Sequence, residues 1–158
     1  MNINIICVGK IKEKYFTQAI AEFEKRLGRF CAFKITELPD RKIPDNPTPG
    51  QEREVLEAEG ADILKNLGKS DYVIALCVEG KELSSEEWAA KTEDIMQTHS
   101  TITYIIGGSL GLSPAVKSRA DLRLSLGRIT LPHRIARLVL TEQIYRCFKI
   151  NANETYHK

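Results

Sequence analysis

The stretch LSLGRITLPH, residues Leu124 to His133, joins a short apolar run to a long helical pattern through an unusual turn. Glycine frees the backbone at Gly127, and Pro132 leads directly into a helix-forming segment that extends to Phe148. Ligands of parallel α/β proteins bind where the strands end, so this glycine-to-proline turn is a candidate binding segment. The stretch therefore indicates a strand, a ligand-binding turn and a helix.

The same alternation of short apolar runs and helical patterns continues through the whole chain. Strands are predicted at residues 3–8, 31–38, 72–78, 101–106 and 121–125. Helices are predicted at residues 14–29, 51–67, 84–96 and 132–148, with a further helix beginning at Ser113-Pro114, and residues 39–50 with four prolines form a loop. Such an alternation of strands and helices predicts a single α/β domain, residues 1–158, with a parallel sheet covered by helices on both faces.

Composition narrows the class of protein without naming a function. The chain has 158 residues, of which 42% are hydrophobic and 28% charged, an ordinary globular balance. It contains neither a run of about 20 apolar residues nor a basic leader, so we expect a cytoplasmic protein with no membrane partner. Its four cysteines form neither CxxC pairs nor zinc-spaced clusters, so we expect reduced, buried thiols and no bound metal.

Positive charge gathers near the C-terminus. Residues 128–158 hold six Lys and Arg against two Asp and Glu, a local charge of +4, which leaves −2 for the rest of a chain whose total is +2. A basic face favours polyanions such as RNA. A merely solvated helix explains the same charge count, and the count by itself favours that simpler interpretation.

Three turns follow predicted strands and together define a candidate pocket: residues 76–80, 106–111 and 127–133. Glycine lets the backbone approach a ligand closely, and free N–H and C=O groups can pair with an adenine edge. The glycine spacing in 107–111 matches neither the dinucleotide motif GxGxxG nor a P-loop. A lone GGxxG sequence is explained better by a structural turn, so it is weak evidence for a ligand.

A family resemblance makes the prediction specific. The stretch 124–133, with TEQIYR at 141–146, IICVGK at 5–10, IIGG at 105–108 and YHK at 156–158, resembles the signature of the ribosomal RNA large-subunit methyltransferase H family of the SPOUT superfamily. The similarity covers the whole chain. One departure is the tail at 151–155, which lacks the expected Gly and Pro.

The resemblance implies both an activity and a fold. The activity is S-adenosylmethionine-dependent methylation of ring N-3 of a pseudouridine in large-subunit (23S) ribosomal RNA, on assembled ribosomes. The fold is a SPOUT-type parallel sheet with a C-terminal trefoil knot that holds the cofactor, in a homodimer. The residues that it assigns to the cofactor are Leu76, Gly107, Gly108, Gly127, Arg128, Ile129, Thr130, Leu131 and Pro132.

Catalytic and RNA-binding roles are hypotheses from side-chain chemistry. His133 and His157 are candidate proton acceptors because histidine titrates near neutral pH, and Arg146 is a candidate for stabilising the developing anion. Arg134 and Tyr156 are candidates for contacting RNA, the tyrosine by stacking on a base. A lone histidine is more often a structural residue than a catalytic one, and packing explains an aromatic residue near a terminus, such as Tyr156, equally well. Glu142 has the i, i+4 spacing for an ion pair with Arg146, which is the simpler role for it.

Two alternatives of other classes remain open. A non-enzymatic RNA- or ribosome-binding α/β module needs only the basic C-terminal region and no cofactor pocket. A flavodoxin-like nucleotide-binding enzyme needs a phosphate-cradling loop, for which residues 107–111 are the only candidate. Binding of S-adenosylmethionine, rather than of flavin or ATP, separates the three.

Overall fold

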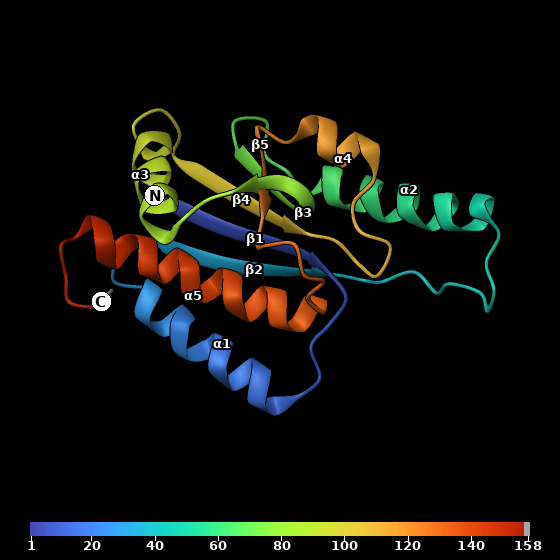
Figure 1. Ribbon diagram of the computed structural model, residues 1–158, viewed down its shortest axis with the longest axis horizontal. Coiled ribbons are helices and arrows are strands. Elements are labelled where there is room, and N and C mark those ends of the chain that lie inside the picture. Colours follow the sequence, from blue (N-terminus) through green and yellow to red (C-terminus); the bar gives the residue numbers. More distant parts are fainter. Residues whose placement is uncertain (157–158) are drawn as a thin grey trace.

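The computed structural model describes residues 1–156 as a five-stranded parallel sheet between two layers of helices (Figure 1). The order across the sheet is β2-β1-β4-β3-β5. The α/β prediction with helices on both faces is therefore confirmed. The strands are β1 (Asn2–Val8), β2 (Ala32–Leu38), β3 (Tyr72–Glu82), β4 (Thr101–Ile106) and β5 (Leu122–Ser125), and the helices are α1 (Lys14–Leu27), α2 (Pro49–Lys65), α3 (Ser85–Met96), α4 (Pro114–Arg119) and α5 (His133–Asn151).

Two hydrophobic cores lie on opposite faces of the sheet. Successive strand residues point to opposite faces, so Ile5 of β1 packs toward α1, α3 and α5, whereas Ile6 packs toward α2 and α4. Leu140 and Ile144 of α5 are fully buried in the first core, and Ile63 of α2 is buried in the second. Burial on both faces explains why the central strands are continuously apolar in sequence.

Reciprocal capping fixes the start of two helices. Ser84 and Glu87 form a capping box at the start of α3: Ser84 Oγ accepts from the Glu87 amide at 3.1 Å, and the Glu87 carboxylate accepts from the Ser84 amide at 2.7 Å. Thr48 and Gln51 form the same box at the start of α2, with Pro49 in the first turn. Helix α2 thus begins two residues before its predicted start, because this cap was overlooked.

The predicted end of β3 is wrong. Instead of stopping at Val78, β3 continues to Glu82 after an irregularity, because its pairing with Leu124 of β5 shifts from Leu76 to Lys81. Gly80 permits this continuation, since a Cβ there would lie 2.6 Å from the backbone carbon of Leu124. The glycine that indicated a turn is thus required for close packing of two backbones.

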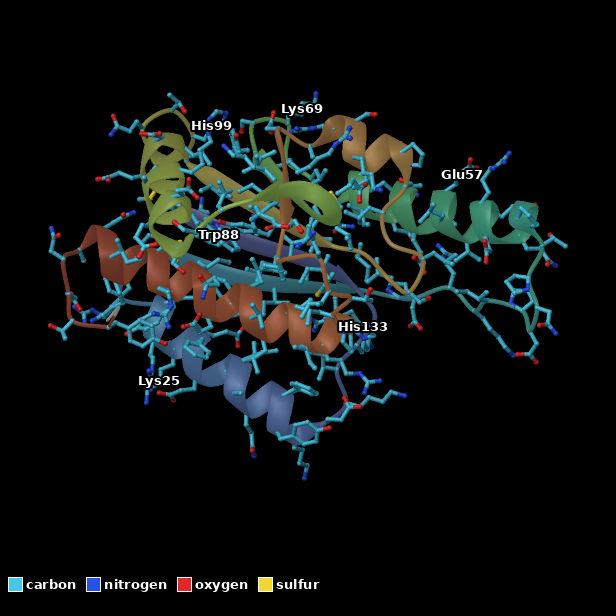
Figure 2. All side chains as sticks on the ribbon, in the orientation of Figure 1. Lys25, Glu57, Lys69, Trp88, His99 and His133 are labelled. Carbon is cyan, nitrogen blue, oxygen red and sulfur yellow. The ribbon has the colours of Figure 1, made fainter. Side chains whose placement is uncertain are left out.

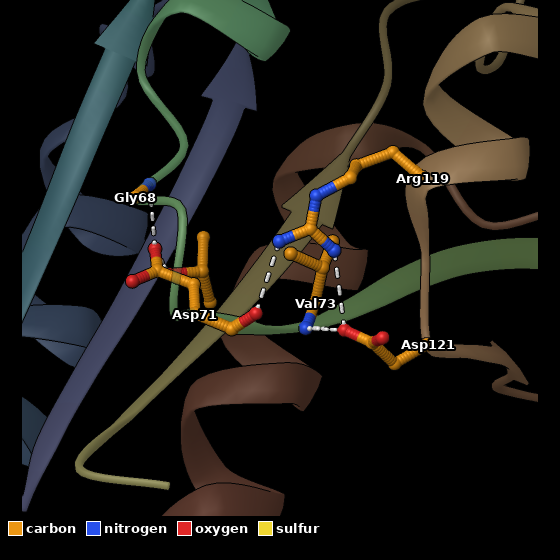
Figure 3. A network of polar contacts seen from close by, with 6 residues as sticks. Gly68, Asp71, Val73, Arg119 and Asp121 are labelled. Carbon is orange, nitrogen blue, oxygen red and sulfur yellow. Dashed lines mark hydrogen bonds and ion pairs between the residues drawn. The ribbon is translucent and has the colours of Figure 1, made fainter.

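A polar network ties the amino-terminal ends of β3 and β5 to α4 (Figure 3). The guanidinium of Arg119 donates to the backbone carbonyl of Asp71 at 3.1 Å and to Asp121 Oδ2 at 3.3 Å. The same Asp121 oxygen accepts from the Val73 amide at 2.8 Å. The Asp71 carboxylate in turn accepts from the buried hydroxyl of Thr103 at 2.7 Å. The network holds the edge strand β5 in register at the sheet end opposite the strands' carboxyl termini.

The four cysteines are all free, but they differ in exposure. Cys7, Cys31 and Cys147 are buried, and burial raises the pKa of Cys7 to about 12 and that of Cys31 to about 11. Cys77 is only partly buried, so the expectation of burial is wrong for this thiol. Within residues 1–156 no helix has the length and apolar character needed to cross a membrane.

Candidate functional site

A cleft of about 560 Å³ opens at the carboxyl ends of β4 and β5 and beside residues 76–79 of β3, in the size range of small-molecule sites. Two of the three turns predicted from the sequence, 106–111 and 127–133, contribute to its walls as turns, whereas residues 76–79 contribute as part of β3. Parallel strands present their carboxyl ends at one edge of the sheet, which brings together segments up to fifty residues apart. The lining residues are 76–79, 106–112, Lys117, 125–127, 129–133 and Ala136.

Glycine is required by the geometry of the turn after β4. A Cβ on Gly107 would lie 2.3 Å from the carbonyl oxygen of Gly111, well inside contact distance. The Gly111 amide donates to the Gly108 carbonyl at 3.0 Å, and Gly111 itself has φ of +81°. The turn is therefore closed tightly on itself, and its backbone rather than its side chains forms this wall of the cleft.

The turn after β5 is shaped by a serine that sequence analysis assigned only to a strand. Ser125 Oγ donates to the Gly127 carbonyl at 3.1 Å and accepts from the Gly127 amide at 3.2 Å. Gly127 has φ of +120°, which L side chains rarely adopt, and a Cβ there would meet nothing within 4 Å. Ser125 thus holds Gly127, the first residue of the 127–133 segment, in this left-handed conformation.

All but one of the residues predicted to contact a cofactor line this cleft. Leu76, Gly107, Gly108, Gly127 and residues 129–132 all belong to its lining. Arg128 does not, and its side chain is exposed.

A charged pair that the sequence did not predict lies at the cleft. Lys117 of α4 donates a hydrogen bond to Glu79 of β3, and that bond lowers the pKa of the glutamate. Only the packing of α4 beside β3 brings these residues together, so no sequence spacing signals the pair. Among residues 1–156, Lys117 is the only Lys or Arg side chain of the lining, and its charge is paired with Glu79, so the cleft offers little to cradle a polyphosphate. This disfavours the flavodoxin-like alternative.

His133 lies at the first position of α5, where it lines the cleft (Figure 2). Its Nε2 atom is 3.6 Å from the position that a Cβ on Gly9 would take, so the ring lies against the end of β1. Partial burial, followed by the positive charges of Arg134 and Arg137, lowers the pKa of this imidazole. The ring is therefore neutral at neutral pH and has a nitrogen that can accept a proton.

Carboxylates neutralise most of the basic charge predicted near the C-terminus. Arg134 pairs with Glu13, and Lys149 pairs with Glu154. Arg137 is buried rather than solvated. Two of the four excess positive charges of residues 128–158, those of Arg134 and Arg137, are thus paired with carboxylates from earlier in the chain, which weakens the case for a non-specific RNA-binding surface.

Arg146 and Tyr156 lie together but away from the cleft. Arg146 Nε donates to Glu142 Oε1 at 3.0 Å, which confirms the predicted ion pair, and the Tyr156 hydroxyl donates to the same oxygen at 3.0 Å. The guanidinium carbon of Arg146 is 4.7 Å from the Tyr156 ring centroid. Arg146 follows His133 by thirteen residues on one helix, or about 20 Å. His157 lies outside the described residues.

No group of three His, Cys, Asp or Glu side chains suited to a metal ion occurs in the part of the chain that the structure describes. The cleft lining combines backbone N–H and C=O groups, apolar walls, the Lys117–Glu79 pair and the imidazole of His133. This combination can hold a nucleoside-like molecule and accept a proton beside it.

Comparison with known proteins agrees with this geometry. Residues 1–157 match the family model described as "Predicted SPOUT methyltransferase". Proteins named ribosomal RNA large subunit methyltransferase H are similar over 100% of both chains, with 56% identity in Ligilactobacillus salivarius, 52% in Streptococcus uberis and 51% in Bifidobacterium adolescentis. A probable methylase family protein from Haemophilus influenzae has the same fold, with a TM-score of 0.54 at 14% identity over 99% of this chain and 70% of its own.

Proposed function

Because the chain belongs to the family of predicted SPOUT methyltransferases, we propose that it methylates large-subunit ribosomal RNA with S-adenosylmethionine as methyl donor. The observation that carries this proposal is the cleft formed by residues 76–79 of β3 and by the two glycine-containing turns that follow β4 and β5. The finer proposal is transfer to ring N-3 of a pseudouridine in 23S rRNA of assembled ribosomes, in the cytoplasm. The names of the full-length relatives support the substrate class.

The proposed architecture is one SPOUT domain, residues 1–158, with a C-terminal trefoil knot. Its support is the course of the chain after β5: residues 126–127 and 129–132 line the same cleft as residues 76–79 of β3 and the turn after β4, before the chain enters α5. A knot that holds a cofactor is expected where a late segment of the chain passes beside two earlier segments in this way.

The cleft suits the nucleoside part of S-adenosylmethionine. Leu76, Leu131 and Ala136 provide apolar walls, and the backbones at Gly107, Gly108 and Gly127 to Pro132 provide hydrogen-bonding groups. The tight turn at Gly107 and the open space beside Gly127 leave room for close approach of a planar base. These residues, with Arg128 at the rim, are proposed to hold the cofactor, which supplies an electrophilic methyl group on a sulfonium.

His133 is proposed to prepare the acceptor for methyl transfer. The imide nitrogen of pseudouridine carries a proton that must leave before it attacks as a good nucleophile. A neutral imidazole at the cleft can accept that proton, and such general-base assistance is worth about 10²- to 10⁴-fold in rate. Holding acceptor and donor in line supplies a further large factor.

The separation along α5 leads us to propose a homodimer whose two chains complete each site. Arg146 and Tyr156 lie about 20 Å along the helix from His133, too far to touch the same base within one chain. A second copy can place its own Glu142–Arg146–Tyr156 cluster against the cleft of the first. There Arg146 would stabilise the developing anion and Tyr156 would stack on RNA, with Arg134 contacting the backbone.

Two measurements on purified protein test the function. Calorimetric titration with S-adenosylmethionine should give saturable binding, and ribosomes from cells that lack this activity should then accept a methyl group at a pseudouridine of 23S rRNA. Leu131→Trp, which fills the cleft, should abolish both, whereas Ile135→Trp on the exposed side of α5 should not. Ribosome binding without cofactor binding by the folded wild-type protein would favour the non-enzymatic module.

A further inference from the structure

A buried carboxylate lies directly behind the glycine turn of the cleft. Glu59 of α2 is only 5% exposed, and a Cβ built on Gly108 would lie 3.0 Å from its Oε2 atom and 3.2 Å from Val8. Glu59 itself does not line the cleft. Its carboxylate therefore contacts the outer side of a turn whose inner side is the cleft wall.

The same carboxylate is joined to the loop between β2 and α2. Its Oε1 atom accepts from the backbone amide of Arg41 at 2.9 Å, and the Arg41 guanidinium pairs with Asp62, one turn further along α2, at 2.6 Å. Glu59 thus lies between the 39–48 loop and the glycine turn. No other acidic residue of α2 occupies such a position: Glu57, for example, is exposed on the outer side of the helix (Figure 2).

The next residue of α2 brings the helix against the end of the same turn. A Cβ on Gly60 would lie 2.2 Å from Ser113 Oγ, and Ser113 caps α4 by accepting from the Val116 amide. Glu59 and Gly60 therefore support the 108–113 segment at both of its ends. Because interiors are close-packed, a change behind the turn moves the turn itself.

Burying a carboxylate is unfavourable unless it is hydrogen-bonded, so the position of Glu59 needs an explanation. We propose that Glu59 is a positioning residue for the cofactor cleft: it holds Gly108 where the turn can bind the methyl donor. This inference rests on the proposed function. Glu59 acts through the backbone of Gly108 and touches neither substrate nor cofactor.

Affinity for S-adenosylmethionine, measured by calorimetry well below the unfolding temperature, tests the proposal. Glu59→Ala should weaken binding about tenfold, since loss of one buried hydrogen bond and its packing is of that order. Glu59→Gln keeps the shape and the acceptor for Arg41, so it should retain affinity within about threefold. Two matched controls should leave affinity unchanged: Glu57→Ala on the exposed face, and Asp62→Asn, which loosens Arg41 without touching the turn.

A double-mutant cycle with Gly108→Ala identifies the contact. The added methyl group presses on the Glu59 carboxylate, so Gly108→Ala should weaken binding less in the Glu59→Ala background, with a coupling of about threefold or more. When Asp62→Asn takes the place of Glu59→Ala in this cycle, its effect on affinity and that of Gly108→Ala should be additive. If Glu59→Ala does not fold, Glu59→Asp, which draws the carboxylate back from Gly108, replaces it in the cycle.

The possible results separate the two proposals. Weakened binding with coupling to Gly108 supports the positioning role. Unchanged affinity of Glu59→Ala, with only a lower unfolding temperature, overturns that role and leaves the methyltransferase proposal intact. Failure of the wild-type protein to bind S-adenosylmethionine overturns the proposed function and, with it, this inference.

Discussion

Arg137 of α5 donates a hydrogen bond to the carbonyl oxygen of Gly9, 2.9 Å away and 128 residues earlier in the chain. The guanidinium is buried, and a second nitrogen lies 3.3 Å from the carboxylate of Glu37. Gly9, with φ of +92°, directly follows β1, and Glu37 is near the end of β2. This one side chain therefore joins two strand ends to the helix that begins with His133.

Replacing Arg137 should lower stability markedly. Arg137→Met leaves the Gly9 carbonyl and the Glu37 carboxylate without their partner, at an expected cost of about 2–4 kcal/mol in the free energy of unfolding. Arg134→Met removes a more exposed pair with Glu13 and should cost less than about 1 kcal/mol. Urea unfolding of both variants measures the two losses in free energy of unfolding. Equal losses would show that the buried contacts of Arg137 stabilise the fold no more than the exposed pair of Arg134.

The lowered pKa of His133 predicts a pH dependence of stability. The unfolded chain, with a histidine pKa near 6.5, binds the proton more readily than the folded chain. The contribution of neutral His133 to the free energy of unfolding is thus fully present above about pH 6.5. It is lost as the pH falls from there through the pKa of His133 in the folded protein. Wild-type protein should lose more stability than His133→Gln between pH 8 and pH 5. Direct titration of the imidazole by NMR provides the check: a pKa above 6.5 would contradict the expectation.

Two glycines of the turn after β4 should respond differently to alanine. Gly107→Ala brings a methyl group within 2.3 Å of the Gly111 carbonyl and must distort the turn, so binding of S-adenosylmethionine should be lost. Gly111→Ala meets no atom within 4 Å and suffers only from its positive φ, at about 1 kcal/mol. Calorimetric affinities compare the two. Similar behaviour of both variants would mean that the tight closure of the turn is unimportant for the cleft.

The network around Asp121 should affect stability but not the cleft. Asp121→Ala leaves the Val73 amide and Arg119 without their acceptor, and should cost about 1–2 kcal/mol in the free energy of unfolding. Because the network lies at the amino-terminal ends of the strands, the affinity for S-adenosylmethionine should stay within about twofold of wild type. A large loss of affinity in the folded variant would show that the two ends of the sheet are coupled.

Mixing two inactive variants tests the proposed sharing of sites between chains. Leu131→Trp blocks the cleft and Arg146→Ala removes a distant cation, so neither homodimer should methylate ribosomes. A dimer that contains one chain of each kind has one site with an open cleft and an intact Arg146 from the partner. Co-expression should restore up to about half the wild-type activity per mixed dimer. Persistent inactivity of purified mixed dimers would place both residues in one site of one chain.

The sequence predicted the elements well because each carries its own local signal. Apolar runs such as 72–78 and 101–106, and the capping box at Ser84 and Glu87, depend on neighbours within a few residues. The errors occurred where distant segments decide the outcome. Gly80 indicates a turn by itself, but its contact with the backbone of Leu124 keeps it within a strand.

What the sequence by itself determined is the α/β class, the three segments that line the cleft and, through the resemblance, the family. Those properties depend on the local spacing of residues or on short motifs that related sequences share in full. Only the tertiary structure decided the order of strands, the pairing of Lys117 with Glu79, the support of Gly108 by Glu59 and the distance of Arg146 from His133. The physical reason is that packing unites residues that are tens of residues apart, and no local pattern encodes which of them will meet.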